Sequence, residues 1–188
     1  MIIVPRMYTK NEFKHEASYV PEDYDAKSEE FWNYVVEKLN VFRGRIRKIF
    51  RESLSTDTKE ALLALCGNED RSYSVLASLI EEGAELEPTE DPILIAETES
   101  WIEMIKGTPN ETLLELYQQS LAERDRYAAN RIRESLGEEE VCLLLIDSRR
   151  RLQVPQDIRV IRVCPFDPAD YLASTIVKAR LKSKEKQT

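Results

Sequence analysis

A single histidine, His15, occurs among the 188 residues of this sequence. A metal site built from two or three histidines of one chain is therefore excluded, and a serine–histidine–aspartate triad would have to use this residue. His15 lies in the polar segment NEFKHEAS, which is typical of an exposed loop. We therefore expect a surface histidine, no metal site and no cofactor.

Glycine and cysteine are also scarce. The five glycines form neither a Gly-x-Gly-x-x-Gly fingerprint nor a phosphate-binding loop. The three cysteines are an odd number without Cys-x-x-Cys spacing, which argues against a disulfide framework or a cysteine zinc site. Cys142 and Cys164 lie in apolar runs, so we expect them to be buried and inert.

Long apolar runs are missing as well. No stretch of the sequence approaches the roughly 20 apolar residues that a membrane-spanning helix needs. The N-terminal MIIVPRMY is too short and too quickly polar for a signal peptide. Together with the unpaired cysteines, these absences predict a cytoplasmic protein that does not associate with a membrane.

Acidic residues outnumber basic ones, 35 to 27, and the formal net charge is −8. Nucleic acid repels such a chain as a whole, so binding would need a local basic patch. Residues 41–51, VFRGRIRKIFR, contain five basic residues and no acidic one, and residues 178–188 are rich in lysine. We interpret them as a solvated helix face and a solubilising tail. Nucleic-acid binding through residues 43–51 remains the weaker alternative.

The spacing of apolar residues divides the chain into helices and short strands. It predicts a helix over residues 28–53, although the segment IRKIF near its end could instead be a strand. Residues 6–27 are polar and are expected to be irregular. The other expected strands are residues 2–5, 85–87, 141–146 and 158–164, and the other expected helices follow Thr58, Asp70, Asp91, Thr108 and Asp167.

Strands that alternate with helices predict an α/β fold with a short, largely parallel sheet packed by several helices. The sequence shows no obvious linker, so we expect a single domain over residues 1–178. A basic, flexible tail is expected over residues 179–188.

An aspartate falls on the apolar face of the helix that begins with the capping box of Thr108 and Glu111, with Pro109 at the first helical position. At about 100° per residue, Asp125 lies within the apolar stripe and Arg124 borders it. A buried carboxylate needs a partner, and Arg124 cannot readily serve because adjacent helical residues diverge. We expect the partner to be a backbone N–H group, an arginine of residues 148–151 or a bound ligand.

Charged residues also follow two expected strands. Glu90 comes after residues 85–87, and Asp147, Arg149 and Arg150 come after residues 141–146. Ligands of open α/β sheets bind at the carboxyl ends of the strands, where arginines can hold a phosphate or carboxylate through paired hydrogen bonds. Alternatively, Glu90 is a first-turn acid of the next helix and the arginines balance an acidic surface.

The segment after residue 122 contains Glu123, Arg124, Asp125, Ala129 and Ile132 in the pattern E-R-D-x-x-x-A-x-x-I, followed by a hydrophobic strand. This arrangement is similar to the C-terminal part of the TraB/Tiki-like superfamily, whose distant relatives include erythromycin esterase and ChaN-like proteins. The segment GAELEPTEDP also resembles a family segment that carries an acidic residue, here Glu90. The resemblance implies an α/β fold whose better-known members are proposed hydrolases, some metal-dependent, that use glutamate and histidine.

The chain departs from that family at both histidine positions. The family's glycine and histidine after the hydrophobic strand correspond to Asp147 and Arg150, and its histidine–threonine pair near the start corresponds to Tyr8 and Thr9. A metal-bound water or a general base would have lost its ligands. The resemblance therefore implies a member that lost the ancestral chemistry and kept the scaffold.

We favour a non-catalytic protein that binds a protein partner or a small anionic ligand. The alternative is a hydrolase with a rebuilt site, in which Glu90 or Asp125 is the base and Arg149 or Arg150 stabilises an oxyanion. The sequence leaves the oligomeric state open. The candidate ligand-binding residues are Arg124, Asp125, Asp147, Arg149 and Arg150.

Overall fold

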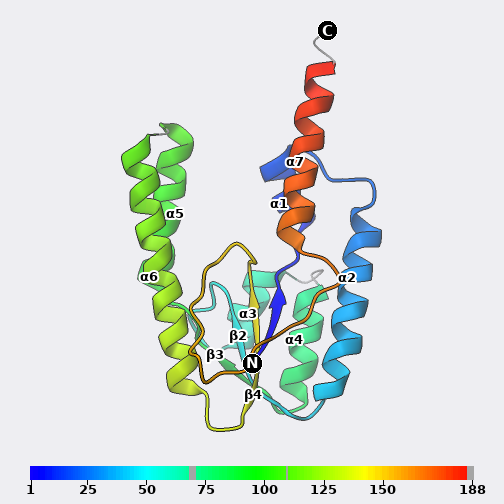
Figure 1. Ribbon diagram of the computed structural model, residues 1–188, viewed down its shortest axis with the longest axis vertical. Helices are drawn as coiled ribbons and strands as arrows, with labels where there is room; N and C mark the ends of the chain where they lie inside the picture. Colours follow the sequence, from blue (N-terminus) through cyan, green and yellow to red (C-terminus); the bar gives the residue numbers. More distant parts are fainter. Residues whose placement is uncertain (68–70, 109, 186–188) are drawn as a thin grey trace.

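Five parallel strands form the centre of the molecule. The computed structural model describes residues 1–67, 71–108 and 110–185 (Figure 1). Within them the strand order is β3-β2-β4-β1-β5, and every neighbouring pair is parallel. The predicted α/β fold with a parallel sheet is confirmed. The strands are β1 (Ile2–Pro5), β2 (Ile46–Arg51), β3 (Glu85–Glu87), β4 (Val141–Ile146) and β5 (Ile161–Arg162).

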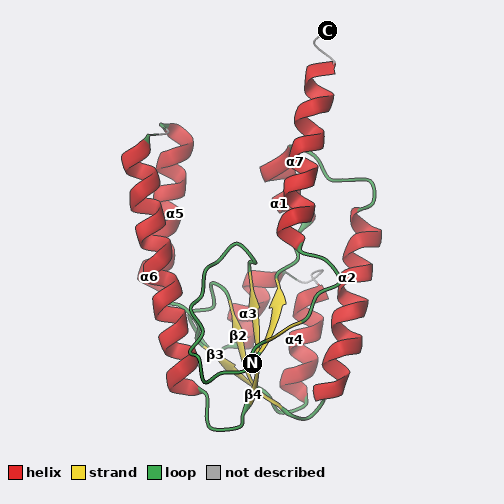
Figure 2. Cartoon of the chain, viewed as in Figure 1, coloured by secondary structure: helices red, strands yellow, loops and turns green. Residues whose placement is uncertain are grey.

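Helices lie on both faces of this sheet (Figure 2). A larger core packs one face against α1, α2, α3, α4 and α7, and a smaller core packs the other face against α6. None of the helices in the described part of the chain is both long and apolar enough to cross a membrane. The helices are α1 (Lys10–Ala17), α2 (Tyr24–Leu39), α3 (Lys59–Cys66), α4 (Arg71–Glu81), α5 (Pro92–Gly107), α6 (Glu111–Ser135) and α7 (Pro168–Glu185).

The central strand β4 is buried on both faces, as its continuous apolar sequence VCLLLI indicates. Leu143 belongs to the larger core, whereas Cys142 and Leu144 belong to the smaller one. Burial raises the pKa of the Cys142 thiol to about 11, so the thiol stays protonated and inert, as expected. Cys164, which was also expected to be buried, is partly exposed.

The prediction of one helix over residues 28–53 is wrong in its second half. The helix α2 ends at Leu39, a 3₁₀ turn follows over Asn40–Phe42, and Ile46–Arg51 forms β2, the alternative left open for IRKIF. Gly44 has a φ of +66°, a left-handed conformation that glycine adopts without steric cost, and it lets the chain turn before the strand. Pairing of β2 with β3 and β4 outweighs the helical spacing of its apolar residues.

The basic residues of this segment do not form the continuous helix face that we expected. Arg43 contacts Glu82 at 2.7 Å, and Lys48 contacts Glu87 at 2.6 Å. Arg51 is buried. The basic residues of this segment therefore do not share one surface, and acidic neighbours neutralise part of their positive charge.

Part of the segment 6–27, expected to be irregular, is helical. The helix α1 occupies Lys10–Ala17, and α2 begins at Tyr24. Thr9 and Glu12 form a capping box, in which the Glu12 backbone N–H donates to Thr9 Oγ1 and the Thr9 backbone N–H donates to the Glu12 carboxylate. This capping signal is present in the sequence as T-x-x-E, but the polar composition of the segment favours an irregular structure over a helix. His15 is exposed near the end of α1, as expected.

Two helix boundaries differ from the expected ones. Asn110 caps the start of α6, with its Oδ1 accepting from the Leu113 N–H at 2.9 Å, whereas Thr108 caps the end of α5. Asp70, Pro109 and the end of the expected tail, residues 186–188, lie outside the described residues. Residues 179–185 of that tail continue α7, since no glycine or proline interrupts them.

Replacing Leu144 by alanine should lower the free energy of unfolding by about 2–5 kcal/mol, because Leu144 is 0 % exposed in the central strand and its loss leaves a cavity. Chemical denaturation followed by circular dichroism measures this change. Val160→Ala is the matched control, since Val160 is 43 % exposed and its truncation should change stability by no more than about 0.5 kcal/mol. Equal effects of the two substitutions would contradict the assignment of β4 to the core.

Candidate functional site

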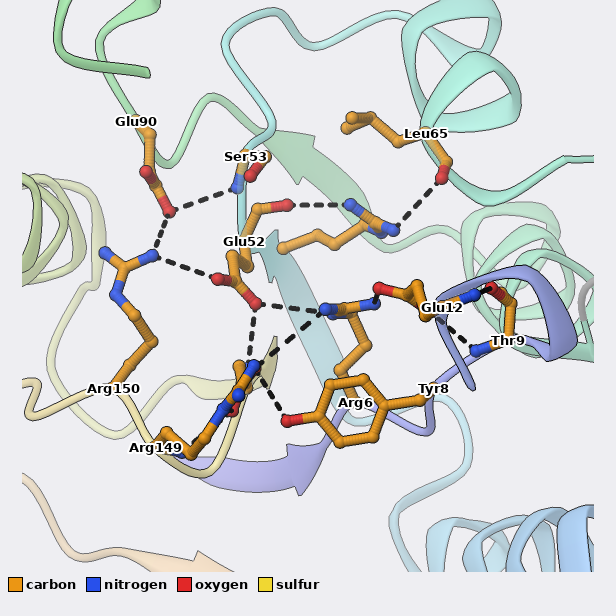
Figure 3. Close-up of polar contacts among 12 residues, drawn as sticks. Arg6, Tyr8, Thr9, Glu12, Glu52, Ser53, Leu65, Glu90, Arg149 and Arg150 are labelled. Atoms are coloured by element: carbon orange, nitrogen blue, oxygen red, sulfur yellow. Dashed lines mark hydrogen bonds and ion pairs between the residues drawn. The ribbon is translucent and has the colours of Figure 1, made fainter. Parts of the chain in front are cut away.

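Charged side chains from four strand ends meet at the carboxyl edge of the sheet (Figure 3). They lie in the segments that follow β1, β2, β3 and β4, and α6 adds two more. Each of the six candidate residues from the sequence takes part in these contacts. We call the set the carboxyl-edge network: Arg6, Tyr8, Glu52, Ser53, Glu90, Arg124, Asp125, Asp147, Arg149 and Arg150.

Glu90 is the most buried carboxylate of the network, with a side chain that is 1 % exposed. Its Oε2 accepts a hydrogen bond from Arg124 Nε at 2.5 Å. Its Oε1 accepts from Arg150 Nη1 and from the Ser53 backbone N–H, both at 3.1 Å. One carboxylate thus joins two guanidinium groups and the ends of three strands to α6.

Asp125 finds the kind of partner that the sequence predicted. Its Oδ1 accepts from Arg150 Nε at 2.6 Å, and its Oδ2 accepts from the Arg151 backbone N–H at 3.1 Å. Arg124, the adjacent residue on α6, points instead to Glu90 and Ser53. Asp125 therefore holds the loop after β4 against α6.

Arg150 lies at the centre of the network. Besides Asp125 and Glu90, it contacts Glu52 Oε1 through Nη1 at 3.1 Å. Burial opposes its charge, but the carboxylates of Glu90, Glu52 and Asp125 raise its pKa above the usual value of arginine. Arg150 is therefore a permanent buried cation.

Asp147 and Tyr8 form the other end of the network. Tyr8 Oη donates to Asp147 Oδ2 at 2.8 Å, and Arg149 donates to the same carboxylate through Nη2 at 2.8 Å. Burial alone would raise the pKa of Asp147, but the hydrogen bonds from Arg149 and Tyr8 hold it below its usual value. Burial and the Asp147 carboxylate raise the pKa of the Tyr8 hydroxyl well above its usual value. The tyrosine is therefore neutral and the aspartate is charged.

The Tyr8 ring also lies between two guanidinium groups. The central carbons of Arg6 and Arg149 are each 5.2 Å from the ring centroid, a distance at which cations interact with aromatic faces. Arg6 forms ion pairs with two carboxylates: its Nη1 lies 2.6 Å from Glu12 Oε1, and its Nε lies 3.4 Å from Glu52 Oε2. The Arg149 side chain is 58 % exposed, so it is the arginine of the network most accessible to solvent.

The sequence patterns do not single out Arg6, Glu52 or Ser53, and they mark Tyr8 only as the position that corresponds to a histidine in the TraB/Tiki-like resemblance. Arg6 and Glu52 are each the first residue after a strand, the same position that drew attention to Asp147. A helix is expected to include Glu52 and Ser53, and Arg6 lies in a segment expected to be irregular, so neither pattern points to a site. Correct strand assignments would have identified the two residues that follow a strand directly.

One donor of the network lacks an acceptor. The Arg150 side chain is 5 % exposed, and its Nη2 has no hydrogen-bond acceptor among the described residues. Leaving a buried donor unsatisfied costs about 1–3 kcal/mol, and proteins usually avoid this with an ordered water, an ion or a ligand atom. Nη2 is therefore a buried donor whose expected acceptor is a water molecule, an ion or a ligand atom.

A cavity of about 780 Å³ adjoins the network at Tyr8, and Thr9 also lines it. Trp32 and Tyr24 of α2 contribute to its walls, and Lys14 is among the basic residues that line it. Its volume lies in the range of small-molecule sites, roughly 300–1,000 Å³. No group of three or more histidine, cysteine, aspartate or glutamate side chains among the described residues is arranged to hold a metal ion.

Comparison of the chain with models of known protein families, with curated proteins and with solved structures finds no match.

Replacing Glu90 by glutamine should lower the free energy of unfolding by about 3–5 kcal/mol, because two buried guanidinium groups would lose their shared counter-ion. Urea denaturation at neutral pH measures the change. Glu97→Gln is the control, since Glu97 is exposed on α5 and should matter by less than about 0.5 kcal/mol. A cost below about 1 kcal/mol for Glu90→Gln would mean that the network does not stabilise the fold.

Replacing Asp147 by asparagine should destabilise the protein at neutral pH but much less in acid. The pKa of Asp147 is depressed in the folded state, so its contribution is complete above the unfolded-state pKa, near 4, and is lost as the pH falls through the folded-state value. Unfolding free energies of the native and variant proteins between about pH 3 and pH 7 test this. A stability difference between native and variant proteins that stays constant across this pH interval would contradict the prediction. Asp57→Asn, at an exposed position, serves as the control.

Proposed function

We propose that this chain is a non-catalytic α/β protein that binds a small ligand carrying a carboxylate or phosphate group. The observation that carries the proposal is the buried Arg150 Nη2, which lacks an acceptor among the described residues. A charged oxygen of a ligand would complete the hydrogen bonds of this guanidinium group. The three free cysteines suit a reducing compartment such as the cytoplasm.

The position of Arg150 supports a ligand rather than a purely structural role. The network occupies the carboxyl ends of the strands, and β4 lies between β2 and β1. The chain after β2 leads to α3, which packs on one face, and the chain after the neighbouring strand β3 leads through α5 to α6, which covers the other. Crevices form where connections leave a sheet toward opposite faces, and these are the usual ligand sites of open α/β folds.

Arg149 supplies the accessible part of the proposed site. Its exposed guanidinium group can meet a ligand in solvent, and Tyr8 and Asp147 hold it in place. The cavity next to Tyr8 offers room for the remainder of a small molecule. The charge on the ligand would thus meet arginine, whose planar group suits carboxylate and phosphate oxygens.

The hydrolase alternative receives less support. A general base must reach the proton that it removes. Glu90 and Asp125 are 2 % and 8 % exposed, and both accept hydrogen bonds from Arg150. We therefore do not assign either carboxylate as a base.

We propose further that the chain is a distant relative of the TraB/Tiki-like superfamily that no longer carries its chemistry. The positions of the resemblance, Glu90, Arg124 and Asp125, contact one another or share Arg150 in this structure. Arg150 stands where the family has histidine, and it places a fixed positive charge between these carboxylates. A fixed cation in that position favours binding of an anion over metal-dependent hydrolysis.

Inorganic phosphate should raise the melting temperature of the protein in a saturable manner. At 100 times Kd the expected stabilisation is about 2.7 kcal/mol, or roughly 5–10 °C for a chain of this size. Thermal unfolding is measured in phosphate, sulfate and citrate against chloride at equal ionic strength. Arg150→Lys should lose most of the shift, because lysine keeps the charge but lacks the second guanidinium nitrogen.

Arg126→Lys is the matched control, since Arg126 is exposed on the same helix as Arg124 and should respond to phosphate as the native protein does. Arg149→Gln, at an accessible position, should raise the Kd without preventing folding. The proposal would be rejected if none of the three anions gives a saturable shift, or if the shift survives in Arg150→Lys.

A further inference from the structure

The helix α5 carries seven large apolar side chains, of which Ile93 and Met104 are 76 % and 52 % exposed and the other five are half-buried. Its one buried residue is Thr98. The helix packs along α6 and makes no comparable contact with another described element. Its exposed apolar side chains lack the cover that an apolar surface normally acquires. The seven residues are Ile93, Leu94, Ile95, Trp101, Ile102, Met104 and Ile105.

The outer halves of α5 and α6 form an arm that extends beyond the carboxyl edge of the sheet (Figure 1). Met104 and Leu114 are 52 % and 44 % exposed, and each lies three residues from the end of its helix at the turn, hence at about the same height. The exposed charges of the arm are mostly negative. They are Glu97, Glu99, Glu103, Glu111 and Glu115, with Lys106 as the one basic residue between positions 97 and 115.

The helix α7 presents the opposite charge. It extends in the same direction as the arm, on the other side of the sheet (Figure 1). Ala173, Val177 and Leu181 form an exposed apolar stripe at four-residue spacing, and Val177 and Leu181 are 56 % and 57 % exposed. Lys178 and Arg180 are exposed beside this stripe.

The arm and α7 of one molecule are too far apart to cover each other. The arm follows β3 and α7 follows β5, which are the two edge strands of the five-stranded sheet. Four spacings of about 4.8 Å separate the edges by roughly 19 Å, whereas packed helices lie about 8–10 Å apart. The inner part of α7 is also held in the larger core through Leu172.

We propose that α7 of one molecule docks on the α5–α6 arm of a second copy of this chain. Each copy supplies both surfaces, so the contact occurs twice around a twofold axis and forms a closed dimer. The apolar stripe of α7 covers the exposed residues of α5 and α6, and its basic residues face the glutamates of the arm. This inference is independent of the anion site, because neither surface includes a residue of the carboxyl-edge network.

A charge exchange tests this arrangement by sedimentation velocity of the full chain over about 1–100 μM, a range in which weak dimers dissociate. The native protein should form a dimer, and Lys178→Glu with Arg180→Glu should raise its Kd at least tenfold. Glu103→Lys with Glu111→Lys should do the same on the arm. An equimolar mixture of the two variants should restore dimers, since in the mixed dimer both contacts pair opposite charges.

Lys59→Glu, at an exposed position on α3, is the control and should leave the Kd unchanged. Val177→Asp tests the apolar part of the contact and should abolish the dimer while the circular dichroism spectrum is retained. A native protein that stays monomeric at the highest concentration would overturn the proposal. A dimer that tolerates the α7 and arm substitutions, or variants that do not recombine, would overturn it as well.

Discussion

The burial of two guanidinium groups, those of Arg124 and Arg150, is the constraint on which the arrangement of this molecule depends. A buried cation must be paired, and here Glu90, Asp125 and Glu52 provide the pairing. These carboxylates come from the end of β2, the segment after β3 and the middle of α6. The pairing is therefore possible only when the sheet edge and the outer helix are in register, so one electrostatic requirement fixes two layers relative to each other.

The same requirement limits what the site can do. Carboxylates that already accept hydrogen bonds from arginine are poor candidates for proton transfer, whereas the arginines keep nitrogen atoms that those carboxylates do not use. The groups of the network that remain available for further hydrogen bonds are thus its arginines, although the protein as a whole is acidic. The proposed anion site would therefore distinguish ligands by the geometry of their charged oxygens, and long-range attraction would contribute little.

The sequence predicts those parts of the structure in which local signals and burial agree. The apolar runs at 2–5 and 141–146 correspond to β1 and β4, and the placement of Asp125 on an apolar stripe predicts its burial and its arginine partner. The prediction leaves helix and strand open near residues 46–51, where helical spacing competes with sheet pairing that only distant residues provide. Glu52 is missed for the same reason, since its role depends on where the strand ends. The convergence of the four strand ends is a property of the topology and is not encoded in any single segment.

The order of the strands also has a consequence for how the chain acquires its structure. β1 pairs only with β4 and β5, so within the described residues its partners begin about 140 positions later. β2 and β3 are the one pair of neighbouring strands that precedes residue 141. During synthesis β1 must wait for about 140 further residues before its neighbour β4 is made and the sheet can close around it. Folding of such long-range contacts is slow, and the apolar segment of β1 stays unpaired in that interval.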